Sequence, residues 1–107
     1  MITDLKPAKR IVDPNAGLAK AQAEGRCRLC HGPVASRHHL VSRSLRGDDV
    51  DENLVPLCGS GSTGCHGAVE ARDPLVCSLL RLRLTGDELA YVLLKKGADW
   101  LERYYPA

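Results

Sequence analysis

The chain has 107 residues, of which 44% are hydrophobic and 26% charged, and its formal net charge is +2. These values predict one small globular domain, and the charge is too mild to indicate a nucleic-acid partner by itself. No apolar run is long enough to span a membrane, and the first residues lack the apolar stretch of a secretory signal. We therefore expect a cytoplasmic protein without a membrane partner, in which a structural metal would help so small a domain to fold.

The first half of the chain predicts one short helix and two short extended segments. Residues 1–14 contain several Lys, Arg and Pro residues, and we expect a flexible N-terminal arm there. Residues 16–25 are rich in Ala and other good helix formers and end in a glycine that can stop a helix. Residues 39–41 are predicted to form a short strand, and a polar loop at 42–52 separates them from a short apolar segment at 53–57.

The second half predicts a series of short helices, the first of them at residues 64–72 after a turn rich in Gly and Ser. Asp73 and Pro74 have the residue types of an N-cap and of the first position of a helix. Thr85 and Glu88 fit a capping box that begins the next helix, and a last short helix follows it.

Apolar residues at helical spacing predict how the helix after the Asp-Pro pair packs. We expect four of them to share the face that contacts the core: Leu75, Val76, Leu79 and Leu80. We also predict that Cys77 is a small core residue of this helix and not a metal ligand.

Four of the five cysteines form two pairs. Cys27 and Cys30 lie in RCRLCHG, where they match, together with His31, the C-x-x-C-H attachment site of a c-type haem. The same two residues can instead form half of a zinc site, because Cys58 and Cys65 supply a second pair downstream. Four thiolates can close a tetrahedral structural Zn²⁺ site, and we favour this interpretation over haem and over four unrelated buried cysteines.

Polar residues between and after the cysteine pairs follow a distinctive order. The motifs are CRLC at 27–30, HHL at 38–40, NLVPLC at 53–58 and GCH at 64–66. Together they resemble the HNH endonuclease family, the ββα-metal nucleases, over about residues 26–72.

The resemblance implies an α+β fold and a function. Residues 15–72 would form a ββα-metal core held by the zinc site, and residues 73–107 would form a helical extension packed on it. The implied activity is metal-dependent hydrolysis of phosphodiester bonds in DNA, as in the small HNH proteins of phages, mobile elements and restriction systems.

By position, the resemblance makes His39 the general base and Asn53 the residue that positions it through an amide hydrogen bond. A neutral imidazole can act as a base near pH 7, because the ordinary pKa of histidine is about 6.5. The resemblance makes His38 and His66 ligands of a catalytic divalent cation (Mg²⁺, Mn²⁺, Ni²⁺ or Zn²⁺). Neighbouring residues of a strand point to opposite faces, which suits the two adjacent histidines to different roles. Some members of the family have another histidine where this chain has Glu70, which is either a third, oxygen ligand or a solvated glutamate.

Three arginines flank the two adjacent histidines: Arg37, Arg43 and Arg46. They can neutralise phosphates of a bound nucleic acid, although a solvated charged loop has the same composition. No aromatic residues are interleaved with them to stack on single-stranded bases, so we expect double-stranded DNA held by its backbone. The alternative function is a non-catalytic, zinc-stabilised module that binds DNA or a protein, and the sequence favours neither a monomer nor a dimer.

Overall fold

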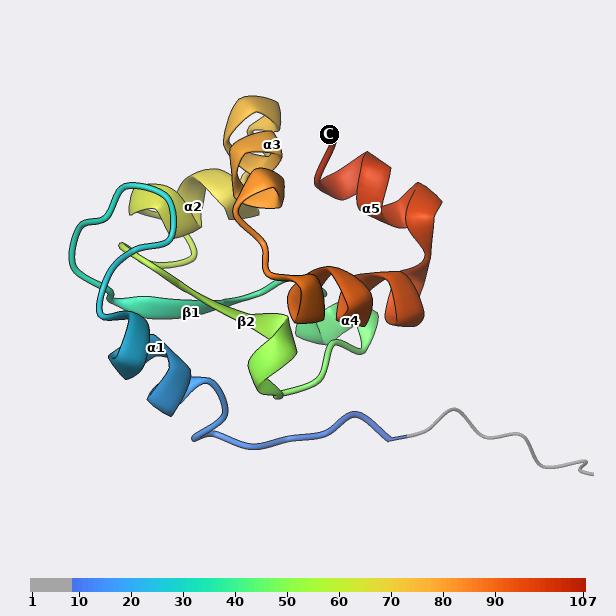
Figure 1. The fold of residues 1–107 in the computed structure, drawn as a ribbon, viewed down its shortest axis with the longest axis horizontal. Helices are drawn as coiled ribbons and strands as arrows, with labels where there is room; N and C mark the ends of the chain where they lie inside the picture. Colours follow the sequence, from blue (N-terminus) through green and yellow to red (C-terminus); the bar gives the residue numbers. More distant parts are fainter. Residues whose placement is uncertain (1–8) are drawn as a thin grey trace, which may run out of the picture.

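Five α-helices and a two-stranded antiparallel sheet make up the computed structural model of the protein, which describes residues 9–107 (Figure 1). In chain order the elements are α1 (Leu18–Glu24), β1 (Ser36–His39), η1 (Arg43–Leu45), η2 (Asp51–Asn53), β2 (Leu54–Leu57), α2 (Gly64–Glu70), α3 (Pro74–Leu82), α4 (Gly86–Lys96) and α5 (Ala98–Tyr104), where η1 and η2 are single 3₁₀ turns. The fold is therefore α+β, as the sequence predicts. None of the helices in this range has the length and apolar character that crossing a membrane requires.

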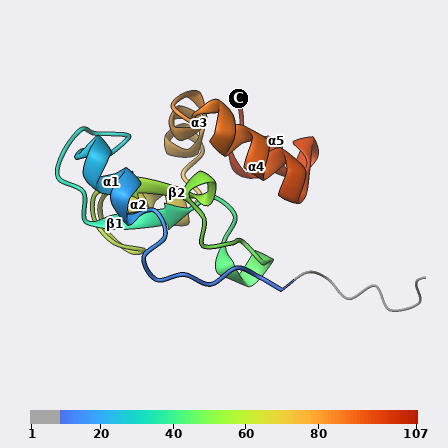
Figure 2. The ribbon, with the colours of Figure 1, turned by 60° about the horizontal axis from the view of Figure 1, so that its bottom comes forward.

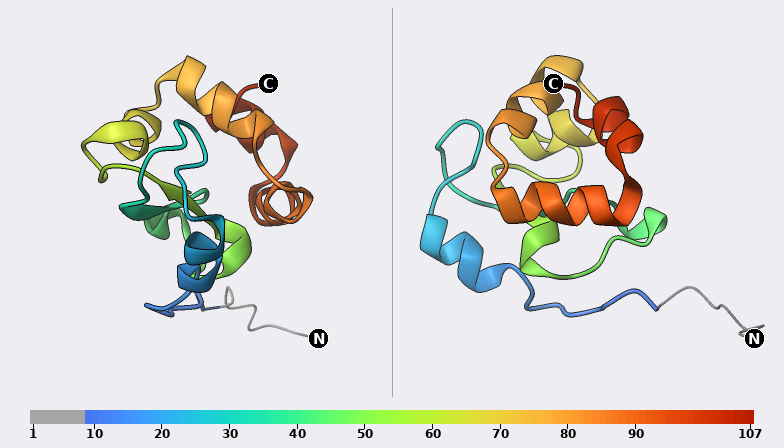
Figure 3. Two further views of the ribbon diagram at one scale, coloured as in Figure 1. Left: turned by 60° about the vertical axis from the view of Figure 1, so that its left-hand side comes forward. Right: turned by 45° about the vertical axis from the view of Figure 1, so that its right-hand side comes forward.

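The helices surround the small sheet unevenly. Helices α1 and α2 lie on opposite sides of it (Figure 1), whereas α3, α4 and α5 gather together beside it (Figure 2). The same grouping is seen when the molecule is turned about its vertical axis (Figure 3). The sheet is thus the central element of the fold.

The sheet pairs β1 with β2 in antiparallel register. The strand predicted at 39–41 is displaced toward the N-terminus, since β1 ends at His39. It ends there because the backbone N–H of Val41 donates to the side chain of Asn53 at 2.8 Å and no longer to a neighbouring strand. Side chains alternate along the strand, so His38 is buried while the next residue remains partly exposed.

The helix boundaries confirm the capping signals in the sequence. Helix α1 ends at Gly25, whose φ of 68° is in the left-handed region that favours glycine. The Asp73 carboxylate accepts hydrogen bonds from two backbone N–H groups in the first turn of α3. Thr85 and Glu88 form the predicted capping box at the start of α4.

The predicted core face of α3 is wrong in two of its members. Leu75 and Leu79 are 82% and 38% exposed, whereas Cys77 and Leu80 are buried. Leucines occur around most of this helix, so their spacing did not distinguish the face that meets the core. The buried core consists of Cys27, Leu29, Leu40, Val41, Val55, Leu57, Val69, Cys77, Leu80, Val92, Leu101 and Tyr105.

The loop between the two strands is closed by the buried side chain of Asn53. Its Oδ1 accepts from the N–H of Val41 at 2.8 Å, and its Nδ2 donates to the carbonyls of Val41 at 3.0 Å and Asp48 at 2.9 Å. Gly47 passes so close to Val41 that a Cβ there would lie 1.7 Å from the carbonyl oxygen. These contacts hold both ends of the loop in one conformation.

The segment before α1 is fastened to this loop. The backbone N–H groups of Ile11 and Asp13 donate to the carboxylates of Asp48 and Asp49, at 2.8 and 2.9 Å. The predicted flexible arm is therefore bound at these residues, because the two aspartates supply acceptors for its backbone. Residues 1–8 of that arm lie outside the described residues.

Glu88 is a buried carboxylate that joins three parts of the fold. It accepts from the guanidinium of Arg28 at 2.7 and 3.0 Å, from the ammonium of Lys20 in α1, and from the N–H of Thr85 at 2.7 Å. Burial raises the pKa of Glu88, but the hydrogen bonds from Arg28 and Lys20 outweigh it and lower the pKa below the ordinary value. The ionised carboxylate thus connects α1, the first cysteine pair and α4.

We expect Glu88→Gln to lower the free energy of unfolding by about 3 kcal/mol at pH 7.5, measured by urea denaturation of the zinc-loaded protein. The loss arises because Lys20 and the side chain of Arg28, only 11% exposed, keep their charges after the buried carboxylate is removed, and Arg28 retains only its more exposed partner Glu24. The matched control is Glu102→Gln, which removes the same charge from an exposed pair with Arg81 and should leave stability nearly unchanged. Equal losses in both variants would contradict the role of Glu88.

Candidate functional site

Four cysteines lie together in the structure. The sulfur atoms of Cys27, Cys30, Cys58 and Cys65 are all within 4.8 Å of one another, and those of Cys30 and Cys58 are 3.5 Å apart. Zn–S bonds of about 2.3 Å place the sulfurs of a tetrahedral site about 3.8 Å apart. The cluster can therefore hold a structural metal such as zinc, and the donor set of four thiolates fits that ion.

Two tight turns present these sulfurs. In the first, the backbone N–H groups of Cys30 and Gly32 donate to the sulfurs of Cys27 and Cys30. In the second, the N–H of Cys65 donates to Cys58 Sγ at 3.4 Å. Burial raises the pKa of the Cys27 thiol, but hydrogen bonds from backbone N–H groups outweigh it and lower the pKa to about 7. The backbone of the first turn thus favours a thiolate at Cys27.

His31, which completes the apparent haem motif, lies outside this cluster. Its backbone is left-handed, with φ of 64°, and its Nε2 is 3.4 Å from the guanidinium of Arg83. Cys27 and Cys30 instead share their cluster with the second cysteine pair. The grouping agrees with the interpretation of the two pairs as one metal site.

A second group of possible ligands brings together His38, His66 and Glu70. One ligand atom from each lies within 4.8 Å of the others. Glu70 Oε1 is 3.0 Å from His38 Nδ1 and 3.3 Å from His66 Nε2, so Glu70 contacts both rings and is not simply a solvated glutamate. Two imidazole nitrogens and one carboxylate oxygen are donors that suit Mn²⁺, Ni²⁺ or Zn²⁺.

Electrostatics at this group favour a neutral ring beside an anion. Burial lowers the pKa of His38, which favours its uncharged form. The group therefore offers a carboxylate beside the buried, uncharged ring of His38, a combination that attracts a cation.

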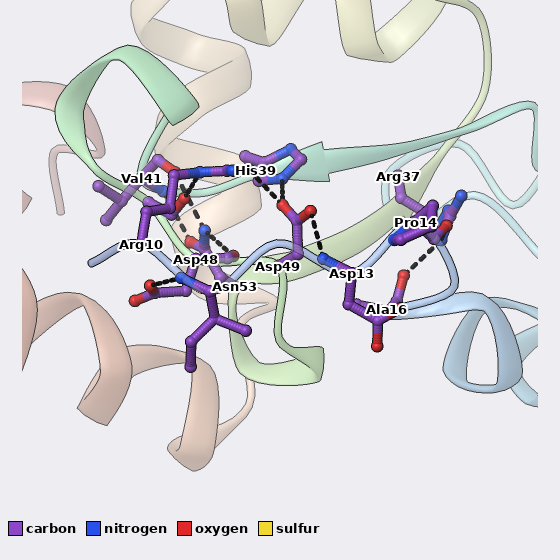
Figure 4. A network of polar contacts seen from close by, with 12 residues as sticks. Arg10, Asp13, Pro14, Ala16, Arg37, His39, Val41, Asp48, Asp49 and Asn53 are labelled. Carbon is purple, nitrogen blue, oxygen red and sulfur yellow. Dashed lines mark hydrogen bonds and ion pairs between the residues drawn. The ribbon is translucent and has the colours of Figure 1, made fainter. Parts of the chain in front are cut away.

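His39 is held by an aspartate that the sequence analysis did not identify. Its Nε2 lies 2.8 Å from Asp49 Oδ1, and Asp49 also accepts from the N–H of Asp13 and the guanidinium of Arg10 (Figure 4). Burial raises the pKa of Asp49, but these partners outweigh it and lower the pKa below its ordinary value. Asp49 thus stays ionised and orients the ring.

The predicted contact between Asn53 and His39 is wrong. All the hydrogen bonds recorded for the Asn53 side chain go to the backbone of Val41 and Asp48 (Figure 4). Its effect on His39 is indirect, because it fixes the loop that carries Asp49. No signal in the sequence distinguishes Asp49 from the other acidic residues of that loop.

A hollow of about 400 Å³ connects His39 with the second ligand group. Its lining includes His39 together with the possible ligands His66 and Glu70. A second hollow of about 260 Å³ shares three residues with the first: Arg37, His39 and Arg43. The two hollows therefore meet along β1, at the residue predicted to be the base.

The three predicted DNA-binding arginines differ in their surroundings. Nη1 of Arg37 donates to the carbonyls of Pro14 and Ala16, so this side chain holds the segment before α1 (Figure 4). Arg43, on η1, is exposed and lines both hollows. Arg46 is exposed just after η1. Arg43 is thus the best placed of the three to meet a ligand in the hollows.

Comparisons of the chain with protein-family models, with curated proteins and with solved structures gave no significant match. The geometry of the two ligand groups and of His39 is therefore what indicates a function.

Proposed function

We propose that the protein is a small metal-dependent endonuclease of the HNH type that hydrolyses phosphodiester bonds in DNA. The observation that carries the proposal is the hollow in which His66 and Glu70, two members of the second ligand group, lie with His39. Hydrolysis of a phosphodiester needs an activated water and stabilisation of the charge that develops on phosphorus and on the leaving oxygen. A metal group beside a histidine base can meet both needs.

In this proposal, His38, His66 and Glu70 hold one divalent cation. When bound, the cation supplies Lewis-acid stabilisation of the phosphate and of the departing 3′-oxygen. His39 takes a proton from the attacking water: its Nε2–H donates to Asp49, which leaves the lone pair of Nδ1 to accept that proton. Asp49 then stabilises the imidazolium that forms.

The cysteine cluster contributes by fixing the ligands in place. Cys65 directly precedes His66, so zinc binding there would hold the first turn of α2 and with it the His66 ring. The same helix carries Glu70 one turn later. In this way one structural metal would order two of the three residues that hold the second ion.

DNA fits the surroundings of the hollows. Exposed Arg43 lies beside His39, where its guanidinium can pair with a backbone phosphate. Because such contacts do not depend on base sequence, we propose double-stranded DNA gripped by its backbone as the substrate.

The test is nicking of supercoiled plasmid by protein that carries one equivalent of zinc. We expect open circles after addition of Mn²⁺ or Ni²⁺, with less product in Mg²⁺ because two of the three ligands are imidazoles, and none without added metal. If none of these metals supports nicking by the folded, zinc-loaded protein, the nuclease proposal is wrong. Retention of the plasmid in a gel-shift assay would then favour the binding module.

A further inference from the structure

The hydroxyl of Tyr105, a fully buried residue that follows α5, contacts the ring of His38. The hydroxyl oxygen lies 2.7 Å from the carbonyl oxygen of Leu40 and 2.9 Å from His38 Nε2. A carbonyl can only accept, so the single hydroxyl proton is donated to Leu40. Toward His38 the same oxygen must accept. The ring hydrogen therefore lies on Nε2, and Nδ1 keeps its lone pair.

A second hydroxyl makes the same arrangement at His66. Ser36 Oγ lies 3.0 Å from the carbonyl oxygen of Gly59, to which it donates, and 2.6 Å from His66 Nδ1. Because the serine has only one proton, its oxygen accepts from the ring. The hydrogen of His66 is thus on Nδ1, and the lone pair is on Nε2.

These two tautomers determine which ring nitrogens of the ligand group carry a lone pair toward Glu70. Nδ1 of His38 and Nε2 of His66 are the two nitrogens that face Glu70 Oε1, at 3.0 and 3.3 Å. In the assigned tautomers neither nitrogen has a hydrogen to give to the carboxylate. Three electron pairs then converge on one small region, an arrangement that is repulsive by itself and complementary to a cation.

We propose that Tyr105 and Ser36 are positioning residues that hold His38 and His66 in their metal-binding tautomers. Each hydroxyl accepts from a ring N–H and is itself oriented by donation to a backbone carbonyl. The inference rests on the proposed metal site and identifies the residues that prepare it. Outer hydrogen bonds of this kind orient ligand rings, and their loss weakens metal binding by about 10- to 100-fold.

Packing also fixes the position of the Tyr105 hydroxyl, because the side chain is fully buried. The Tyr105 ring is also packed beside the guanidinium of Arg72, 5.5 Å from the ring centre. The ring that carries the hydroxyl is therefore packed against the connection between α2 and α3.

The first test is direct detection of the ring hydrogens by long-range ¹H–¹⁵N NMR of the wild-type protein, loaded with one equivalent of zinc, at pH 8. We expect the hydrogen on Nε2 of His38 and on Nδ1 of His66. The opposite tautomer at either ring would overturn the assignment for that residue. This measurement needs no substitution, so it stays decisive even where a variant fails to fold.

The second test is titration calorimetry with Ni²⁺ of the same zinc-loaded protein. Tyr105→Phe and Ser36→Ala should each weaken Ni²⁺ binding by about 10- to 100-fold. Ser36→Thr keeps the hydroxyl and should restore the affinity. Tyr104→Phe removes the neighbouring hydroxyl, on a ring that stacks on Trp100, and should leave the affinity unchanged.

The outcomes distinguish failure of the positioning role from failure of the proposed metal site. Wild-type affinity in both Tyr105→Phe and Ser36→Ala would overturn this inference while leaving the metal site intact. Absence of Ni²⁺ binding to the zinc-loaded wild type would instead overturn the proposed metal site, and the positioning role would fail with it.

Discussion

Cys30→Ala is expected to unfold the protein at 25 °C, the largest effect that we predict. A structural zinc bound by four thiolates contributes about 10–16 kcal/mol of apparent binding free energy, whereas a small domain has a net stability of about 5–15 kcal/mol. Removing one of four clustered sulfurs should therefore remove most of the stability of the fold. Zinc content by elemental analysis and thermal unfolding by circular dichroism measure the two parts of the effect.

The matched control is the next residue in the chain. His31→Asn keeps a residue type that tolerates the left-handed backbone at this position and removes the imidazole of the apparent haem motif. We expect one equivalent of zinc and an unchanged melting temperature. If Cys30→Ala also melted cooperatively with a full equivalent of zinc, the four-cysteine site would be wrong.

His39→Ala is expected to reduce the rate of plasmid nicking by about 10²- to 10⁴-fold, the usual contribution of a positioned general base. The loss should appear with every metal that supports the wild type, because His39 does not belong to the ligand group. The measurement is the initial rate of open-circle formation at saturating metal. His31→Asn again serves as a control and should cleave at the wild-type rate.

Two further measurements show whether the lower nicking rate of His39→Ala comes from loss of the base and not from loss of a metal ion. Ni²⁺ affinity and zinc content of His39→Ala should equal those of the wild type, since neither set of ligands is altered. Asp49→Asn keeps the shape of the side chain but removes the charge that orients the ring, so its rate should fall between those of the wild type and His39→Ala. A wild-type rate in His39→Ala would assign the base to another group.

The cysteine cluster could be predicted from the sequence because each cysteine pair is short and its residue type and spacing are informative. The second ligand group was expected from the resemblance to the HNH family, and only the spacing of His66 and Glu70, one helical turn apart, is a local signal. The capping residues of α3 and α4 were predicted for the same reason. The opposite surroundings of His38 and His39 follow from the alternation of a strand.

Features that depend on contacts between residues far apart in the chain could not be predicted from the sequence. Tyr105 lies 67 positions from His38, and nothing near either residue indicates that they meet. Asp49 is one of several acidic residues in its loop, and its place beside His39 depends on how Asn53 and Gly47 close that loop. The core face of α3 likewise depends on its neighbours, because leucines lie on several sides of the helix.

The four residues of β1 do not tolerate a change in the length of the strand. Ser36 and His38 contact His66 and Glu70 from one face of the strand, while His39 meets Asp49 from the other. Adding or deleting one residue within the strand would exchange these faces and bring the wrong histidine to Glu70. A variant with one residue added or deleted in β1 should therefore lose the second ligand group even where the rest of the domain still folds.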